Sequence, residues 1–251
     1  MKISIIIPAH NEEKRIERTL KEYLTFLRNK KLNFEIVVVL NGCKDNTLKI
    51  VSKYKAKDLK ILEFKESGKG FAVIQGFKYA LNSDLIGFVD ADLATSPQAF
   101  YYLIENIKDY GGIIASRYVT GAKLNPKPTL QRIIVSRIYN LLIRTLFVMN
   151  YRDTQCGAKL FKANGIREII DSLTVTRWAF DVDLLYQLKR RGYKIKEIPT
   201  TWSDKKYSTI NFMRAGPMMA LAMIRLRLMN SRFKFIVRGY DLLPNWIKLR
   251  I

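Results

Sequence analysis

LIGFVDADLAT, residues 85–95, is the stretch that decides the fold, because it runs from apolar residues directly into two carboxylates. The apolar residues are typical of a strand buried on both faces, and Asp90 and Asp92 then follow one residue apart. Hard divalent cations prefer carboxylate oxygens and leave coordination positions for substrate phosphates. The spacing therefore indicates a cation site formed by Asp90 and Asp92. Helix capping by Asp92 ahead of Pro97, or a pair of solvated loop acids, stays open as the structural alternative.

Alternating strands and helices surround this stretch. Apolar and β-branched runs predict further strands at residues 2–7, 34–40, 59–64, 113–116 and 193–199, and a polar turn enters a short strand within 152–161. Helical periodicity predicts helices at about residues 12–28, 45–54, 68–81, 130–149 and 177–193, and another from 97 onward. This alternation is typical of an α/β fold with a mainly parallel sheet that helices cover on both faces.

Polar residues follow four of the expected strands, in the segments PAHNEE (8–13), NGCKDNT (41–47), DAD (90–92) and SRY (116–118). Ligands bind at the carboxyl ends of the strands in such sheets, so we expect all four segments to face one crevice. Gly42 permits a ligand to approach the backbone closely, and Lys69 in the glycine-rich SGKG (67–70) is a candidate phosphate contact. The Walker spacing of a P-loop is absent, and no dinucleotide GxGxxG follows the first strand.

Length and composition indicate a folded chain without a thiol-based metal or disulfide framework. The 251 residues, 48% of them hydrophobic, are enough for one large domain or for one domain with an appendage. Cys43 and Cys156 lie far apart and there is one histidine, which excludes a disulfide scaffold and a Cys/His zinc site. A reduced, cytoplasmic setting is the default expectation.

The charge balance is strongly basic, with 44 Lys and Arg against 22 Asp and Glu, a net charge of +22. Such an excess indicates a polyanionic partner, which can be nucleic acid, an anionic membrane or a phosphorylated substrate. Residues 121–152 and 205–251 concentrate the excess and are also rich in apolar side chains. This combination favours an anionic membrane surface over a nucleic-acid groove. No apolar run reaches the ~18 residues of a spanning helix, so we expect the chain to lie on a membrane rather than to cross one.

Several of these motifs together resemble a known enzyme family. IIIPAHNEE, NGCKDNT, ESGKG and DAD resemble family 2 inverting glycosyltransferases of the GT-A fold, the fold of nucleotide-diphospho-sugar transferases. RDTQCGAKLF, RWAFDVDLLY, TWSD and IRLRL look like dolichyl-phosphate β-glucosyltransferases and their dolichyl-phosphate mannose synthase relatives. The resemblance covers nearly the whole chain up to about residue 230, and the second group of motifs is the more specific for the polyprenyl-phosphate branch.

The resemblance, together with the strand-end pattern, implies a set of site residues. Those implied in nucleotide binding are Pro8, Ala9, Asn11, Glu12, Asn41, Gly42, Lys69, Asp90 and Ala91. Those implied in catalysis are Asp92, Asp181, Arg117, Arg132, Ser136 and either Lys205 or Lys206. Asp92 is the implied principal ligand of Mg²⁺ or Mn²⁺, and Asp90 contacts the ribose or the metal. Arg132 and Ser136 match a pair that meets the lipid phosphate in mannose synthases.

Two positions depart from the family pattern. Asn41 stands where the family usually has an aspartate on the base, which puts the base preference in doubt. Ala94 stands where mannose synthases often carry glutamine, which counts against a plain mannose synthase. Asp181 has two possible roles: it is a base in relatives that use a hydroxyl acceptor, and with a phosphate acceptor it orients sugar hydroxyls or a cation.

The resemblance implies transfer of a hexose, glucose from UDP-glucose, to dolichyl or another polyprenyl phosphate by a peripheral or monotopic enzyme on the cytoplasmic face of a membrane. Mannose transfer from GDP-mannose and sugar transfer to a hydroxyl of a glycan or lipid remain alternatives. A non-catalytic protein that binds polyanions or membranes is a distant alternative, and no nucleic-acid partner is expected. We expect a catalytic domain over residues 1–205, with an amphipathic membrane-interface helix at about 130–149, and a basic, membrane-associating segment over 206–251.

Overall fold

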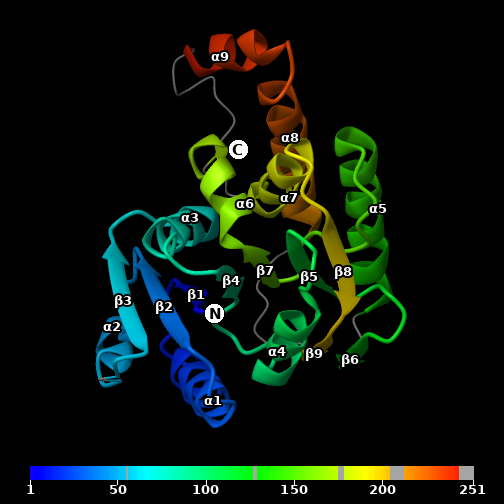
Figure 1. Ribbon diagram of the computed structural model, residues 1–251. Helices are drawn as coiled ribbons and strands as arrows, with labels where there is room; N and C mark the ends of the chain where they lie inside the picture. The colour runs from blue at the N-terminus through cyan, green and yellow to red at the C-terminus, as the bar shows by residue number, and fades with distance from the viewer. Residues whose placement is uncertain (55, 127–128, 175–177, 204–211, 243–251) are drawn as a thin grey trace.

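The computed structural model describes residues 1–54, 56–126, 129–174, 178–203 and 212–242, without the side chains of residues 132, 212–215, 241 and 242. A central sheet has helices on both faces, and a pair of helices near the C-terminus extends beyond it (Figure 1). The mainly parallel α/β architecture predicted from the sequence is confirmed.

The central sheet has seven strands in the order β3-β2-β1-β4-β7-β5-β8. In chain order they are β1 (Ile3–Ala9), β2 (Phe34–Asn41), β3 (Leu59–Phe64), β4 (Leu85–Val89), β5 (Gly112–Ser116), β7 (Ala158–Lys162) and β8 (Ile195–Pro199). β7 pairs antiparallel with both β4 and β5, while the other neighbouring strands are parallel. Because β7 lies between β4 and β5, its first residue lies at the edge where its two neighbours end.

Alternate residues of each strand face opposite layers of helices. Ile5 and Ile7 pack in one core cluster with helix α1 (Ile16–Asn29), and Ile6 packs in the other with helix α3 (Lys69–Tyr79). A Cβ atom at Gly76 of α3 would overlap the Ile6 side chain, so this glycine sets how closely α3 approaches the sheet.

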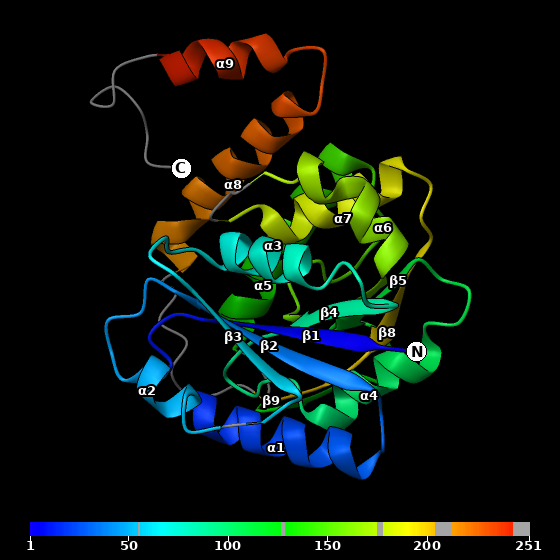
Figure 2. The ribbon, with the colours of Figure 1, turned by 60° about the vertical axis from the view of Figure 1, so that its left-hand side comes forward.

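Figure 2 shows the two layers with the sheet between them. One face carries α1 (Ile16–Asn29), α2 (Thr47–Val51) and α4 (Pro97–Asn106). The other carries α3 (Lys69–Tyr79), α5 (Leu130–Phe147), α6 (Ala163–Ile169), α7 (Phe180–Arg190) and α8 (Phe212–Met229), and α9 (Lys234–Leu242) packs against α8. A short 3₁₀ turn, Ile170–Ser172, follows α6. The sequence predicted helices on both faces, and this prediction is confirmed.

The helix boundaries differ from those expected at several starts. Helix α1 begins at Ile16 rather than at Glu12, whose carbonyl accepts from the N–H groups of Arg15 and Ile16 at 2.9 Å. Helix α4 is capped by Ser96, whose Oγ accepts from the N–H of Ala99 at 3.2 Å. The alternative prediction from the sequence, that Asp92 caps this helix, is therefore wrong.

A small second sheet lies beside the main one. It pairs β6 (Lys123–Asn125) in parallel with β9 (Thr201–Ser203). An isolated bridge joins Thr95, in the loop after β4, to Trp202 of β9. This arrangement brings residues 201–203 to the loop that carries the two aspartates.

Helix α5 carries apolar side chains on its exposed face as well as on its buried face. Ile138 is 64% exposed and Leu141 60% exposed, while Ile143 and Phe147 are buried. Within the described residues, no helix combines the length and apolarity needed to cross a membrane. The predicted role of 130–149 at a membrane interface stays a prediction, and so does the domain boundary after residue 205, which lies outside the described residues.

Candidate active site

The strand ends predicted to face one crevice lie along one edge of the sheet. Strands β1, β2 and β4 are parallel neighbours, and β5 runs in the same direction on the far side of the antiparallel strand β7. The carboxyl ends of all four strands therefore lie at the same edge of the sheet. The segments beginning at Pro8, Asn41, Asp90 and Arg117 follow these four strands directly or end them. The edge therefore carries nearly all the described residues that the sequence singled out.

Asn41 connects three of the loops at this edge. The side chain is 2% exposed, and with its amide nitrogen toward Ala9 it donates to the Ala9 carbonyl at 2.8 Å and accepts from the N–H of Gly68 at 2.9 Å. A ring nitrogen of His10 lies 2.6 Å from the Asn41 carbonyl oxygen. Both ends of the amide are thus hydrogen-bonded within the protein, so Asn41 helps to shape these loops, and its predicted contact with the base stays a prediction.

A cavity of about 810 Å³ opens beside these loops. Its lining residues are His10, Asn11, Leu40, Gly42, Cys43, Lys44, Glu63, Phe64, Lys65 and Ser67. Gly42 has φ of 65° and Asn11 has φ of 54°, left-handed conformations that shape the turns at the cavity mouth. The Asn11 side chain also accepts from the N–H of Lys44 at 2.8 Å. The volume lies in the range of about 300–1,000 Å³ that small-molecule sites occupy.

Helix α1 holds the loop that carries Asp90 and Asp92. The Thr19 hydroxyl donates to the Ala91 carbonyl at 2.7 Å, and the Tyr23 hydroxyl donates to the Thr95 carbonyl at 2.9 Å. Both hydroxyl-bearing residues are fully buried, so the loop is fixed from the core side. The two aspartates are left half-buried at the sheet edge.

Acidic side chains gather around Asp92. Its Oδ1 accepts from the N–H of Ala94 at 2.9 Å, and burial, with a contribution from Asp90, raises its pKa. Burial also raises the pKa of Glu12, and the charges of Asp92 and Asp90 add to this effect, although Arg15 pairs with Glu12 at 2.6 Å and opposes it. Carboxylates that raise one another's pKa in this way would be stabilised by a cation.

Asp90 is paired with Lys69, the lysine of the glycine-rich turn, whose predicted contact with a phosphate stays a prediction. Lys69 Nζ lies 2.6 Å from Asp90 Oδ1. Burial alone would lower the pKa of Lys69, but the carboxylates of Asp90 and Asp181 raise it overall. A Cβ atom at Gly157 would overlap the Asp90 carboxylate, so only glycine at this position leaves room for the pair.

Lys159 and Asp181 form a buried ion pair behind Asp90. Lys159 Nζ lies 2.5 Å from Asp181 Oδ1, donates to the Cys156 carbonyl at 2.7 Å, and stands 5.1 Å from the ring centroid of Phe88. Lys159 is 0% exposed and Asp181 is 8% exposed. Burial would raise the pKa of Asp181, but Lys159 and Lys69 outweigh it and hold that pKa below its usual value. Asp181 is therefore a stably ionised carboxylate and a poor proton acceptor.

Asp183, two residues further along α7, has a structural role. Its carboxylate accepts from the N–H and the hydroxyl of Thr174, each at 2.8 Å, and from the Gln187 amide at 3.0 Å. The side chain is fully buried, so these bonds satisfy it and join the start of α7 to the segment that precedes it.

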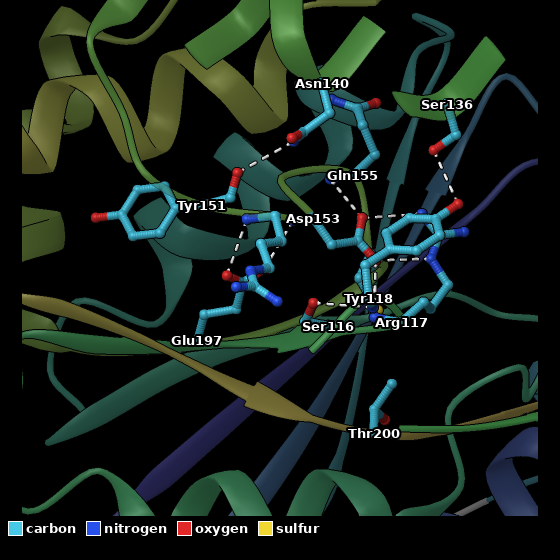
Figure 3. Close-up of polar contacts among 12 residues, drawn as sticks. Ser116, Arg117, Tyr118, Ser136, Asn140, Tyr151, Asp153, Gln155, Glu197 and Thr200 are labelled. Atoms are coloured by element: carbon cyan, nitrogen blue, oxygen red, sulfur yellow. Dashed lines mark hydrogen bonds and ion pairs between the residues drawn. The ribbon is translucent and has the colours of Figure 1, made fainter. Parts of the chain in front are cut away.

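Arg117 is the centre of a second polar network (Figure 3). Its guanidinium donates to both Asp153 oxygens, at 2.8 and 3.0 Å, and the pKa of Arg117 is raised because Asp153 outweighs the effect of burial. Glu197 accepts from the N–H of Asp153 at 2.7 Å. Next to this network, the Tyr118 hydroxyl donates to Ser136 Oγ of helix α5 at 2.9 Å.

The donor set at the sheet edge fits a hard divalent cation with an incomplete protein shell. Within the described residues, the Asp92 carboxylate accepts no hydrogen bond beyond the one from Ala94, while Asp90 is already paired with Lys69. In the described part of the chain, no three His, Cys, Asp or Glu side chains converge as a ready-made metal site. Asp92 is thus the better-placed ligand, and phosphate oxygens and water would complete the shell, as Mg²⁺ commonly requires.

Of the predicted site residues, the side chain of Arg132 and the residues Lys205 and Lys206 lie outside the part of the chain that the structure describes. Three residues that sequence reasoning did not single out are central to the site, namely Asp153, Gly157 and Lys159. A signal for one of them was present, since Lys159 is a charged residue flanked by apolar residues in the strand AKLFK. Such a lysine is buried only when it has a partner.

Comparison with known proteins places this site in context. The family model described as glycosyl transferase family 2 matches residues 4–170. A dolichyl-phosphate beta-glucosyltransferase of Dictyostelium discoideum is 32% identical over 247 residues, covering 90% of this chain and 73% of the relative. One of Drosophila melanogaster is 34% identical, covering 81% and 68%. Glucosyl-3-phosphoglycerate synthase from Mycobacterium tuberculosis, solved with Mn²⁺, UDP and phosphoglyceric acid, shares the fold at a TM-score of 0.68 and 17% identity, covering 90% of this chain and 77% of that one.

The buried ion pair yields a prediction about stability. Lys159→Met leaves the Asp181 charge buried without its partner and should lower the free energy of unfolding by about 3–5 kcal/mol. Lys159→Met/Asp181→Asn, which removes both charges, should recover most of that loss. Urea denaturation of the three proteins measures this. A cost below about 1 kcal/mol for the single variant, the range of exposed pairs, would contradict the burial of this pair.

The same pair predicts a pH effect. Because the pKa of Asp181 is lower in the folded than in the unfolded chain, the pair stabilises the fold above the ordinary carboxyl pKa and loses this contribution as the pH falls through the folded value. Below about pH 4, the difference in unfolding free energy between the native chain and the double variant should therefore shrink.

Proposed function

The chain belongs to glycosyl transferase family 2, and on that premise we propose that this glycosyltransferase moves glucose from UDP-glucose to dolichyl or another polyprenyl phosphate, with inversion at the sugar carbon and with Mg²⁺ or Mn²⁺. The names of the two relatives support the sugar and the lipid acceptor. A solved neighbour that binds UDP and Mn²⁺ supports the nucleotide and the cation.

The observation that carries the choice of acceptor is the ion pair of Asp181 with Lys159. A hydroxyl acceptor needs a base to remove its proton during transfer. Asp181 is the candidate base, but its depressed pKa and its 2.5 Å contact with a buried lysine make it a poor one. A phosphate monoester needs no base, because its second pKa of about 6 leaves it anionic near neutrality. The site thus supports an acceptor that brings its own nucleophilic charge.

The protein's tasks are then to hold the donor and to bring two anions together. The cavity beside Gly42 and Cys43 supports binding of the nucleoside, and Lys69 lies where it can neutralise diphosphate charge. The cation, held by Asp92, would supply stabilisation of the departing nucleoside diphosphate. Two unit charges at ~4 Å repel by roughly 4 kcal/mol at an effective dielectric of 20, so basic groups are needed at the acceptor as well.

The acceptor's phosphate is proposed to meet Ser136 and Arg132 on helix α5. Ser136 already lies 2.9 Å from the Tyr118 hydroxyl, next to the Arg117 network, so this part of α5 adjoins the strand-edge site (Figure 3). The exposed side chains of Ile134, Ile138 and Leu141 on the same helix support peripheral contact with a membrane, on the cytoplasmic face where nucleotide sugars are available. Lys205 or Lys206 would close over the phosphates.

A transfer assay tests the proposal directly. The full chain is incubated with a short polyprenyl phosphate, Mn²⁺ and a panel of labelled nucleotide sugars, and the label that becomes soluble in organic solvent is measured. We expect label from UDP-glucose, and we expect Asp92→Asn or EDTA to reduce its transfer by about 100-fold or more. Label from GDP-mannose alone would change the sugar, whereas the absence of organic-soluble label from every donor would contradict a polyprenyl phosphate acceptor.

A substitution at Gly157 tests whether the position of the Asp90 carboxylate matters for transfer. Gly157→Ala places a methyl group where the Asp90 carboxylate lies and should slow transfer about 100-fold by displacing it. The matched control is Gly216→Ala in helix α8, where an added Cβ meets nothing within 4 Å and transfer should not change. Equal rates for Gly157→Ala and the native chain would show that the position of Asp90 does not matter for transfer.

The two acceptor classes differ in the pH dependence of Asp181→Asn. With a phosphate acceptor, the variant loses activity through the lost ion pair but keeps the acidic limb of kcat/KM, since that limb belongs to the acceptor's own pKa of about 6. With a hydroxyl acceptor, removing the base abolishes the limb and costs about 10²–10⁴-fold in rate. We expect the first result, measured as the pH profile of both proteins.

A further inference from the structure

A small cavity on the outer side of helix α5 is distinct from the site at the sheet edge. It has a volume of about 270 Å³ and is lined by Arg137, Asn140, Leu141, Arg144 and Arg152. It shares no lining residue with the larger cavity beside Gly42. A volume just below the range of about 300–1,000 Å³ for small-molecule sites suits a phosphate group and its ester better than a nucleotide sugar.

Among the residues that the structure describes, the three arginines of this cavity have no acidic partner. No carboxylate of the described residues forms an ion pair with Arg137, Arg144 or Arg152. Arg137 stands 4.6 Å from the ring centroid of Tyr118, and Arg144 donates to the Asn150 side chain at 3.3 Å, so the partners that orient them are neutral. Three positive charges around one hollow attract an anion strongly.

The backbone around the cavity is fixed. The Asn140 side chain is 8% exposed and donates to the Tyr151 carbonyl at 3.1 Å, which ties α5 to the loop that carries Arg152 (Figure 3). Glu197 accepts from the N–H of Arg152 at 2.9 Å. This carboxylate contacts the main chain of the loop and leaves the guanidinium available. Arginines on a fixed backbone can bind phosphate oxygens in pairs of hydrogen bonds.

Apolar side chains surround the cavity on the exposed face of α5. Ile138 and Leu141 are 64% and 60% exposed, and Leu130, the first residue of α5, and Val148, just after its last residue, are 71% and 75% exposed. Proteins bind nucleic-acid phosphates in polar grooves, whereas the phosphate of a membrane lipid lies directly beside its hydrocarbon chains. The combination of guanidinium groups with exposed aliphatic side chains matches a lipid headgroup at a membrane surface.

We propose that this cavity binds the phosphate of an anionic phospholipid, with Arg137, Arg144 and Arg152 around the phosphate and Ile138 and Leu141 among the adjoining acyl chains. The bound headgroup would fix the orientation of α5 on the membrane and hold Ser136 toward the lipid side. The inference rests on the proposed function for the presence of a lipid surface, but the phosphate concerned is that of a bilayer lipid and not that of the acceptor.

Vesicle sedimentation of the full chain tests the proposal without donor or acceptor. Vesicles of phosphatidylcholine alone are compared with vesicles of phosphatidylcholine mixed with phosphatidic acid. The variant Arg137→Gln/Arg144→Gln/Arg152→Gln should bind the anionic vesicles about 100-fold more weakly than the native chain. Arg144→Gln/Arg152→Gln, which leaves the contact with Tyr118 intact, should bind them about tenfold more weakly. Circular dichroism and the melting temperature confirm that each variant is folded.

The matched control removes the same charge elsewhere. Lys21→Gln/Lys49→Gln/Lys53→Gln alters exposed lysines in or next to α1 and α2, on the face of the sheet opposite α5, and should weaken binding less than about threefold. Equal losses for the two triple variants would reduce the effect to net charge and overturn the proposal, as would unchanged binding by the arginine variant.

Kinetics with a short polyprenyl phosphate, without vesicles, separate this inference from the proposed function. The arginine variant should keep the native KM for that acceptor. A raised KM with normal vesicle binding would assign the cavity to the acceptor instead. Absence of transfer in the native chain would refute the proposed function, and the vesicle measurements alone would then decide whether the cavity binds a phospholipid.

Discussion

The site depends on how carboxylates are kept ionised beside one another at the edge of a buried sheet. Asp90 and Asp181 each have a lysine partner, Lys69 at 2.6 Å and Lys159 at 2.5 Å, and both lysines stand near the ring of Phe88. Buried charges of one sign would otherwise repel or take up protons. Asp92 makes no such pair among the described residues, and its pKa is raised, so it is the carboxylate left to attract a cation.

This division of roles bears on the chemistry that the family can perform on one fold. An aspartate at the start of α7 could serve as a base if its pKa were raised, but a fully buried lysine lowers it here. The same lysine also binds the Cys156 carbonyl, next to the glycine that makes room for Asp90. One short segment, residues 156–159, thus contacts both Asp90 of the proposed donor site and Asp181, and the proposed anionic acceptor suits that arrangement.

Local sequence patterns predicted the strands and helices whose formation depends mainly on residues close in sequence. The strands at 2–7, 34–40 and 59–64 were predicted within one or two residues, because continuous apolar runs are needed in a sheet covered on both faces. Helix starts were predicted less well. Glu12 lies in a turn before α1, and its N–H donates to the hydroxyl of Thr47, the first residue of α2, at 2.8 Å. That contact joins residues 35 positions apart, so periodicity alone could not place the start of α1.

The sequence by itself determined that two aspartates follow a buried strand, that four polar loops share one sheet edge, and that the motifs are those of family 2 glycosyltransferases. The tertiary structure decided which charges meet there. Strand β7 enters the sheet antiparallel, with Lys159 opposite Phe88, and this pairing brings Gly157 to Asp90 and Lys159 to Asp181. The register of such a long-range pair depends on burial of both strands together, and a shift of one residue would turn Lys159 to the other face. No local pattern contains that information.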